Sequence, residues 1–154
     1  MTPAIASVKQ SGIPFVIHQF RHDPKKQSYA LEAAEKLGRD RQQIYKTLIV
    51  QFDGGELAVA MLPAALTLSL KVLAKAAEVR KAAMAPAVLA EKTTGYIVGG
   101  ISPFGQKKRL RAFIHEAALE QSGILVSAGR RGLEIELAPA DLLRLTGAVA
   151  VPLT

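Results

Sequence analysis

The chain contains no cysteine and no tryptophan, and aromatic residues make up only 5% of its 154 residues. The absence of cysteine excludes disulfides, thiolate metal ligands and cysteine nucleophiles, and it is compatible with a reducing cytoplasm, where we expect the protein to reside. Few aromatic residues are available to stack on nucleic-acid bases. Any chemistry must therefore come from other residue types.

The sequence also lacks a hydrophobic run long enough for a membrane span. Its most apolar stretch, Leu57 to Leu70, is too short to cross a bilayer and is interrupted by Pro63. The N-terminal stretch "MTPAIASVKQSGIPF" has no basic region ahead of its apolar part, and Lys9 interrupts that part. We therefore expect neither a membrane segment nor a secretory signal.

Acidic residues are few relative to basic ones. Twenty Lys and Arg against thirteen Asp and Glu give a formal charge of +7, which favours polyanionic partners such as nucleic acid without identifying one. Hydrophobic residues make up 49% of the chain, and no low-complexity tract or linker divides it. This length and composition predict one globular domain over residues 1–154.

Turn and capping residues divide the chain into helices and strands. Thr2, Ser28 and Ser69 can each cap a helix, and Asp53-Gly54-Gly55 is typical of a tight antiparallel hairpin. The pattern predicts helices over 3–11, 29–37, 70–79, 86–92 and 139–147, and strands over 14–20, 44–50, 56–63, 96–98, 109–116, 123–128 and 133–137. Because strands and helices do not alternate strictly, we expect an α+β fold with a mixed, largely antiparallel sheet.

The predicted strand "IYKTLIV", residues 44–50, contains one charged residue, Lys46. Strand alternation places Lys46 on the face opposite Thr47, and both faces are mostly apolar. An unpaired ammonium is costly in such surroundings. Lys46 must therefore reach a solvent edge, pair with an anion, or face a cavity where anions bind.

Two familiar catalytic motifs are incomplete in this sequence. His18 and His22 have the spacing of a zincin pair, but "HQFRH" lacks the glutamate and the helical context, and His115 is isolated. Ser102 lies among glycines, yet Pro103 follows it and has no N–H for an oxyanion hole. We expect no metal, no cofactor and no serine nucleophile.

Glycines and basic residues suggest a ligand-binding surface. Gly99-Gly100 follows "YIV" and could aim backbone N–H groups at a carbonyl or phosphate oxygen, or could form only a turn or bulge. The stretches "QKKRLR" (106–111) and "GRRG" (129–132) could contact phosphates, or could be solvated charged edges.

With these residues assembled, the sequence resembles the YbaK family of aminoacyl-tRNA deacylases, which are relatives of the editing domain inserted in bacterial prolyl-tRNA synthetase. The most specific segments are "YKTLIV" and "GGISPFGQKKR", and "HDP", "EAAEKLG" and "VSAGRRGLEIEL" extend the match over nearly the whole chain. The resemblance implies a compact α/β fold around a curved, partly barrel-like mixed sheet. It also implies hydrolysis of mischarged tRNA, typically Cys-tRNA(Pro), in trans to the synthetase and with assistance from the substrate's own thiol.

The resemblance, together with the glycine loop and the basic stretches, suggests a role for each of the following residues. Lys46 corresponds to the family's essential lysine. The substrate-binding positions are Phe20, Tyr29, Thr47, Gly99, Gly100, Ile101, Ser127 and Glu134, and the expected tRNA-binding positions are Lys107, Lys108, Arg109, Arg130 and Arg131.

Three of the substrate-binding positions depart from the family pattern. Phe20 replaces a typical tyrosine, Glu134 replaces an aspartate, and Tyr29 replaces a phenylalanine. Alanine and serine therefore remain alternative substrates to cysteine. Prolyl-tRNA synthetase is the expected partner for tRNA selection, and a tRNA-binding module without catalysis is the competing class of function.

Overall fold

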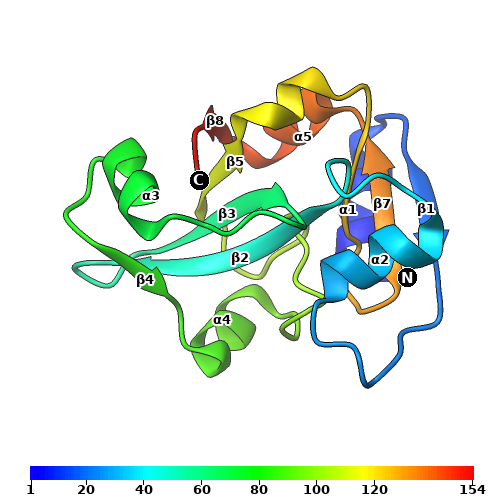
Figure 1. Cartoon of the computed structure of the whole chain (residues 1–154), viewed down its shortest axis with the longest axis horizontal. Helices are drawn as coiled ribbons and strands as arrows, with labels where there is room; N and C mark the ends of the chain where they lie inside the picture. The colour runs from blue at the N-terminus through cyan, green and yellow to red at the C-terminus, as the bar shows by residue number, and fades with distance from the viewer.

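A computed structural model describes residues 1–154 and shows helices packed around two β-sheets (Figure 1). No helix is long and apolar enough to span a membrane. The helices are α1 (Pro3–Ser11), α2 (Tyr29–Leu37), α3 (Leu70–Ala77), α4 (Ala87–Thr94), α5 (Pro139–Thr146) and the short 3₁₀ helix η1 (Glu116–Glu120). The strands are β1 (Val16–Gln19), β2 (Tyr45–Phe52), β3 (Leu57–Pro63), β4 (Ala82–Met84), β5 (Arg111–His115), β6 (Ile124–Ser127), β7 (Leu133–Leu137) and β8 (Val149–Val151).

The strands form a three-stranded sheet in the order β1-β7-β6 and a five-stranded sheet in the order β4-β2-β3-β5-β8. Only the β3–β5 and β5–β8 pairs are parallel, so the predicted α+β fold with a mixed, largely antiparallel sheet is confirmed. The sheets meet at one isolated bridge between Ile44 and Leu125 and do not close into a barrel. In place of the one partly barrel-like sheet that the family resemblance implies, the structure has two sheets joined at this bridge.

Most predicted elements are confirmed, including the β2–β3 hairpin across Asp53-Gly54-Gly55. The predicted strand at 96–98 is wrong. The Gly100 N–H donates to the Ile97 carbonyl at 2.9 Å, which closes a tight turn, and Gly99 has a left-handed φ of 89°. The Tyr96 hydroxyl donates to the Phe104 carbonyl at 2.6 Å, so this segment is a buried, folded loop. The short β4, β8 and η1 had no recognisable sequence signal.

The helix starts follow the expected capping chemistry, with one exception. Thr2 accepts from the Ile5 N–H and Ser69 from the Val72 N–H, each at 3.2 Å. Ser28 occupies the N-cap position of α2, but its side chain makes no capping bond. Its side chain lines the cavity described below instead.

The two faces of β2 pack into different parts of the core. Tyr45 and Ile49 join the larger hydrophobic cluster, whereas Val50 joins a second cluster with Leu73 of α3. This alternation confirms that consecutive residues of β2 face opposite layers. Lys46 and Thr47 consequently point to opposite sides of one strand.

Candidate active site

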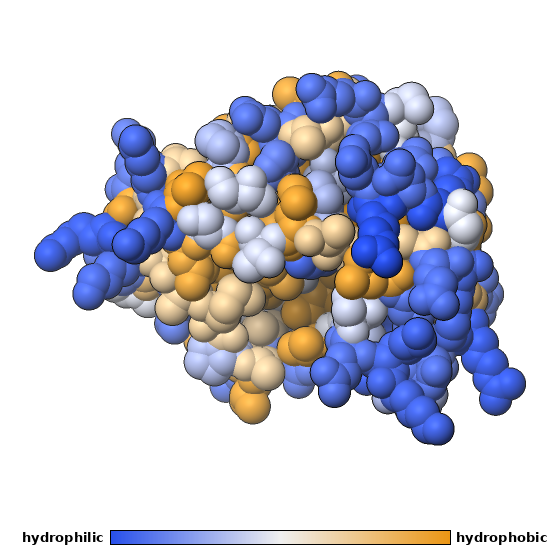
Figure 2. Space-filling model, in the orientation of Figure 1, coloured by the Kyte–Doolittle hydropathy of each residue, from blue (hydrophilic) through white to orange (hydrophobic).

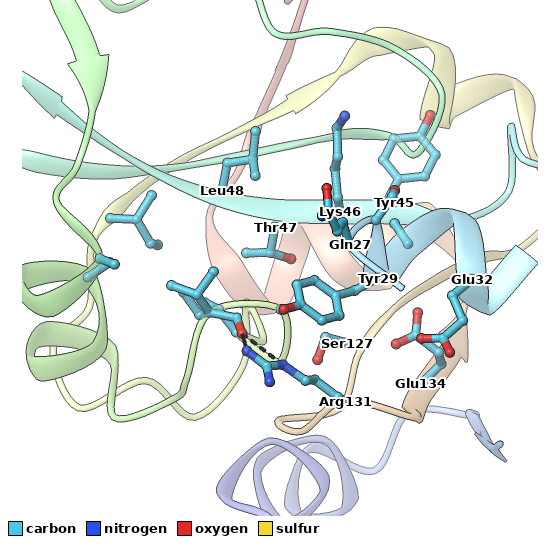
Figure 3. A pocket seen from close by; sticks show the side chains of 18 of the residues that line it. Gln27, Tyr29, Glu32, Tyr45, Lys46, Thr47, Leu48, Ser127, Arg131 and Glu134 are labelled. Atoms are coloured by element: carbon cyan, nitrogen blue, oxygen red, sulfur yellow. Dashed lines mark hydrogen bonds between the residues drawn. The ribbon is translucent and has the colours of Figure 1, made fainter. Parts of the chain in front are cut away.

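A cavity of about 450 Å³ opens between β2, α2, the β4–α4 segment, the Val98–Ile101 loop and the β6–β7 hairpin (Figure 3). Figure 2 shows this face hollowed between α4 and α2, with apolar residues in the hollow and hydrophilic residues over α2. A cavity of this size suits a small ligand or one end of a larger one. Most of the predicted site residues line it: Phe20, Tyr29, Lys46, Thr47, Gly99, Ile101, Ser127, Arg131 and Glu134.

Lys46 is among the lining residues, but its side chain runs to the side of β2 opposite Thr47 and Tyr29 (Figure 3), and its ammonium is already hydrogen-bonded. Its Nζ donates to the Leu66 carbonyl at 2.5 Å and to the Ala64 carbonyl at 3.3 Å, both in the segment between β3 and α3. Both partners are neutral acceptors, so the ammonium has hydrogen bonds but no counterion. Because partial burial opposes charge, the pKa of Lys46 is lowered from its ordinary value. Neutral carbonyls leave the positive charge available to an anion.

Thr47 points to the other side of β2, toward Tyr29 across the cavity (Figure 3). Its Oγ1 is buried and has no hydrogen-bond partner. Buried hydroxyls are normally paired, so an unpaired hydroxyl in a cavity wall is a candidate ligand contact. The Tyr45 hydroxyl is also buried without a partner. Burial is the larger cause, and the negative charge of Glu120 the smaller one, that together raise the pKa of Tyr45 to about 12.

An aromatic and a guanidinium group border the cavity on the side of the β6–β7 hairpin. The guanidinium of Arg131 lies 4.5 Å from the centroid of the Tyr29 ring. The same group donates from Nη2 at 2.7 Å and from Nε at 3.1 Å to the Val98 carbonyl. These contacts connect α2, the Val98–Ile101 loop and the hairpin.

The two glycines of this loop serve close packing. A Cβ on Gly99 would lie 2.6 Å from two Tyr29 ring carbons, and one on Gly100 would lie 2.8 Å from the Cα of Arg130. Gly99 lines the cavity, but Gly100 does not. The Gly100 N–H is also consumed by its bond to Ile97. Gly100 therefore lies outside the cavity lining, and its lack of a side chain lets two turns approach.

Glu134 projects from β7 into the cavity and is buried, with 8% of its surface exposed. Desolvation disfavours its charged form and raises the pKa of Glu134 to about 8. At neutral pH the carboxyl is mainly protonated, so it can both donate and accept a hydrogen bond. Ser127, its cross-strand neighbour on β6, lies on the same wall.

Glu32 also lines the cavity, but its carboxylate is fully paired. It accepts from His22 Nδ1 at 2.7 Å, from the Asp23 N–H at 2.7 Å and from Lys36 Nζ at 2.8 Å. Burial alone would raise the pKa of Glu32, but these hydrogen bonds outweigh it and lower the pKa to about 2. Glu32 therefore fixes the loop before α2, and His22 in turn packs against Tyr29 with ring centroids 5.4 Å apart.

The other histidines also have structural partners. His18 Nε2 lies 2.7 Å from Glu136, which Arg39 contacts as well, and His115 Nδ1 accepts from the Ala117 N–H at 3.0 Å. Ser102 is fully buried, and its Oγ accepts from the Phe104 N–H. None of these residues lines the cavity.

The predicted tRNA-binding residues divide into separate groups. Arg131 lines the cavity, and Arg130 is exposed beside it in the same turn. Lys107 and Lys108 are exposed, and the Lys107 stem packs over Gly95 at the end of α4. Arg109 donates to the Leu145 carbonyl and borders a separate cavity of about 140 Å³. The five residues therefore do not form one wall of the main cavity.

Several lining residues were not predicted from the sequence. They come from the α2 N-terminus, from β2, from the β4–α4 segment and from the Val98–Ile101 loop, and include Gln27, Ser28, Leu48, Met84, Ala87 and Val98. Met84 is 48% exposed, and only the position of β4 beside the cavity identifies it as a lining residue. No local motif marked these positions.

Comparison with known proteins places this fold and site in a family. Residues 24–145 match the model of the aminoacyl-tRNA editing domain. A protein of Enterococcus faecalis named as a candidate Cys-tRNA(Pro)/Cys-tRNA(Cys) deacylase, EbsC, is 41% identical over 145 residues, which cover 94% of this chain and 88% of that protein.

Two solved structures share the fold. The hypothetical protein APE2540 aligns with a TM-score of 0.87 and 24% identity over 99% of each chain. A protein described as a candidate trans-editing enzyme for prolyl tRNA synthetase aligns with a TM-score of 0.86 and 22% identity, covering 100% of this chain and 98% of that one. With the family match and the curated relative, these likenesses establish that the chain belongs to the aminoacyl-tRNA editing domain family.

Proposed function

We propose that this editing domain is a trans-acting hydrolase that releases cysteine from mischarged Cys-tRNA(Pro). The observation that carries the proposal is the match over 94% of the chain to a relative named for this activity. The cavity supports it, because about 450 Å³ suits an aminoacyl group and part of the terminal nucleoside. Ester hydrolysis adds water to the aminoacyl carbonyl carbon and breaks its bond to the ribose oxygen, releasing amino acid and tRNA.

Residue roles follow from the positions in the cavity. Lys46 supplies positive charge at the cavity edge and orients the phosphate and ribose of the terminal nucleotide; its two carbonyl partners are neutral and do not compete as counterions. Ser127 and Glu134 form a polar wall for a small side chain, while Phe20 and Ile101 restrict its size. An aminoacyl ester is already reactive, so positioning and charge stabilisation suffice without a nucleophilic triad.

Cysteine is our proposed substrate, and alanine and serine are the alternatives. A pocket that lacks a dedicated hydrogen bond separates such small side chains by only about 1–3 kcal/mol in binding. If the substrate thiol takes part in ester cleavage, the three amino acids will differ in rate rather than in affinity.

A single-turnover assay on tRNA(Pro) charged with Cys, Ala, Ser or Pro tests this proposal, with buffer alone as the control. We expect the fastest release from Cys-tRNA(Pro) and little release of proline. Fast alanine release with little cysteine release would reassign the substrate. Equal binding of charged and uncharged tRNA without any release would instead establish a binding module.

We further propose that prolyl-tRNA synthetase supplies tRNA identity. Basic side chains such as Arg130 and Lys107 contact phosphates, which position a ligand without reading its sequence. Deacylation of Cys-tRNA(Pro) and Cys-tRNA(Cys) should therefore be similar with the protein alone. Added synthetase should favour Cys-tRNA(Pro), whereas strong discrimination without synthetase would contradict this partnership.

A further inference from the structure

The edge of β2 that faces away from β3 has a short uncovered segment. On one side β4 covers it: the pairing ends at Val50↔Met84, and the Ala85 N–H donates to the Ile49 carbonyl at 3.0 Å. On the other side β6 covers it: the Leu125 N–H donates to the Gln43 carbonyl at 2.8 Å. The edge is open between these two strands.

The hydrogen-bond register identifies the backbone groups in this gap. The Ile44 carbonyl accepts from Ala64 at 2.8 Å, so even-numbered residues of β2 direct their N–H and C=O groups toward β3. Odd-numbered residues direct theirs to the opposite edge, as the Ile49 carbonyl does. Thr47 lies in the middle of the gap, and both of its backbone polar groups therefore face the cavity.

The cavity lining agrees with this geometry. All five consecutive residues from Tyr45 to Ile49 line it. A cavity against one face of a strand would touch alternate side chains only, so this cavity lies along the strand edge. The buried, unpartnered Oγ1 of Thr47 adds a third polar group at the same place. A ligand with matching donors and acceptors can supply hydrogen-bond partners for such a set of unpaired polar groups.

Building on the proposed deacylase function, we propose that the aminoacyl group of the substrate pairs with Thr47 as a one-residue antiparallel β-bridge. The α-amino group donates to the Thr47 carbonyl, and the Thr47 N–H donates to the ester carbonyl oxygen. An aminoacyl ester carries a nitrogen and a carbonyl on either side of one carbon, as a peptide residue does. In an antiparallel hydrogen-bonded pair, two opposed residues exchange both bonds.

The bridge fixes where the rest of the substrate lies. Directly opposed residues place their side chains on the same face of the sheet, so the amino-acid side chain lies beside Thr47 Oγ1. The antiparallel direction carries the ester oxygen and the ribose toward Lys46. The bridge thus fixes the positions of the ester, the amino-acid side chain and the nucleotide relative to the edge of β2.

Residue-resolved amide hydrogen exchange tests the bridge, with 3′-cysteinylamino-3′-deoxyadenosine as a non-hydrolysable probe. The Thr47 N–H should exchange readily in the free protein and at least tenfold more slowly in the complex. Lys46 and Leu48 are the matched controls, because their N–H groups face β3 and should be protected in both states. Binding of the probe is measured directly by isothermal titration calorimetry, and its inhibition of Cys-tRNA(Pro) deacylation is measured separately.

The outcomes separate this inference from the proposed function. If the probe inhibits but Thr47 exchange is unchanged, the bridge is rejected and the deacylase function stands. If the protein neither deacylates Cys-tRNA(Pro) nor binds the probe, both are rejected. Substitution gives a second readout: Thr47→Val should slow cysteine release at least tenfold while keeping Thr47 backbone protection with bound probe, and Thr47→Ser should restore most of the rate. Equal rates for the two variants would exclude a contact of Oγ1 with the substrate side chain.

Discussion

The guanidinium of Arg131 lies 4.5 Å from the centroid of the Tyr29 ring and donates two hydrogen bonds to the Val98 carbonyl. One side chain from the β6–β7 hairpin thereby holds together α2 and the loop that carries Gly99. The planar guanidinium can stack on the ring and donate through two N–H groups at once, a fixed geometry that a lysine ammonium does not offer. The shape of this side of the cavity therefore depends on how closely the three segments approach.

Gly99→Ala should disrupt this approach. The new Cβ would lie 2.6 Å from the Tyr29 ring and 2.9 Å from Arg131 Nε, and φ at this residue is 89°. We expect at least about a tenfold loss of deacylase activity, because small misplacements at a reacting site are costly. Gly12→Ala is the matched control: its φ is 79° but no atom lies within 4 Å of the new Cβ.

Both alanine variants should lose about 1–2 kcal/mol of unfolding free energy from left-handed strain, Gly99→Ala should lose more because of its close contacts, and only Gly99→Ala should lose activity. Urea denaturation and single-turnover kinetics on the two variants make this comparison. Full activity of folded Gly99→Ala would show that the Tyr29–Arg131 packing does not shape the site.

Lys46→Ala should lower kcat/KM by at least about 100-fold, because the variant lacks the positive charge at the cavity edge. Its effect on stability should stay below about 1 kcal/mol, since the ammonium bonds only to two carbonyls at the end of a flexible stem. Lys71→Ala on α3, an exposed position, controls for the change in net charge. Equal kinetics for the two variants would remove Lys46 from the site.

The sequence predicted the local structure well where capping and turn chemistry decide it. Thr2, Ser69 and the glycines of the β2–β3 hairpin specify their elements through short-range contacts. The segment after α4 failed because "YIV" has strand-forming residues, whereas the buried hydroxyl bond of Tyr96 and the turn at Gly99 fold it as a loop. A tertiary contact overrode a local preference there.

The site was only partly predictable for a related physical reason. Alternation correctly separates Lys46 from Thr47, but it cannot show that the strand edge is uncovered between β6 and β4. That gap depends on where two distant strands stop pairing. The partners of Lys46 likewise come from the loop between β3 and α3, and no pattern near Lys46 indicates them.

Glu134 should make stability fall as pH rises. Its folded-state pKa of about 8 lies above the ordinary value of 4.5, so its stabilising contribution is complete below about pH 4.5 and is lost as pH rises to about 8. The Glu134→Gln variant has no ionisable group at this position, so its stability lacks this pH dependence. Between pH 5 and pH 8, the native protein should lose on the order of 2–4 kcal/mol more unfolding free energy than the variant.

Urea denaturation at several pH values measures this difference, and the exposed Glu35→Gln provides the control. Parallel pH profiles for the native protein and Glu134→Gln would show that the Glu134 carboxyl ionises at its ordinary pKa in the folded state.

Glu32 should have the opposite pH dependence. Its folded-state pKa is about 2, so its contribution is complete above about pH 4.5 and is lost as pH falls toward 2. Glu32→Gln should cost about 2 kcal/mol at pH 7, because the amide cannot accept from His22, Asp23 and Lys36 together. Denaturation at pH 7 and pH 3 should show the gap between native and variant narrowing at the lower pH; a constant gap would indicate a loss of packing instead.

The basic residues should contribute unequally to tRNA binding because they lie on different surfaces. Arg130 is exposed in the hairpin turn next to Arg131, whereas Arg109 bonds to the Leu145 carbonyl beside a separate cavity. Arg130→Gln should weaken binding of Cys-tRNA(Pro) several-fold and reduce the salt slope by about 1, as expected for one lost phosphate contact. Arg109→Gln removes the same charge and should change both quantities much less.

Release from cysteinyl-adenosine, which lacks the tRNA phosphates, should be unchanged by either substitution. An equal loss of tRNA binding in the two variants would mean that the acceptor stem crosses both surfaces, and an effect of Arg130→Gln on the small substrate would place that residue in the cavity rather than along the tRNA.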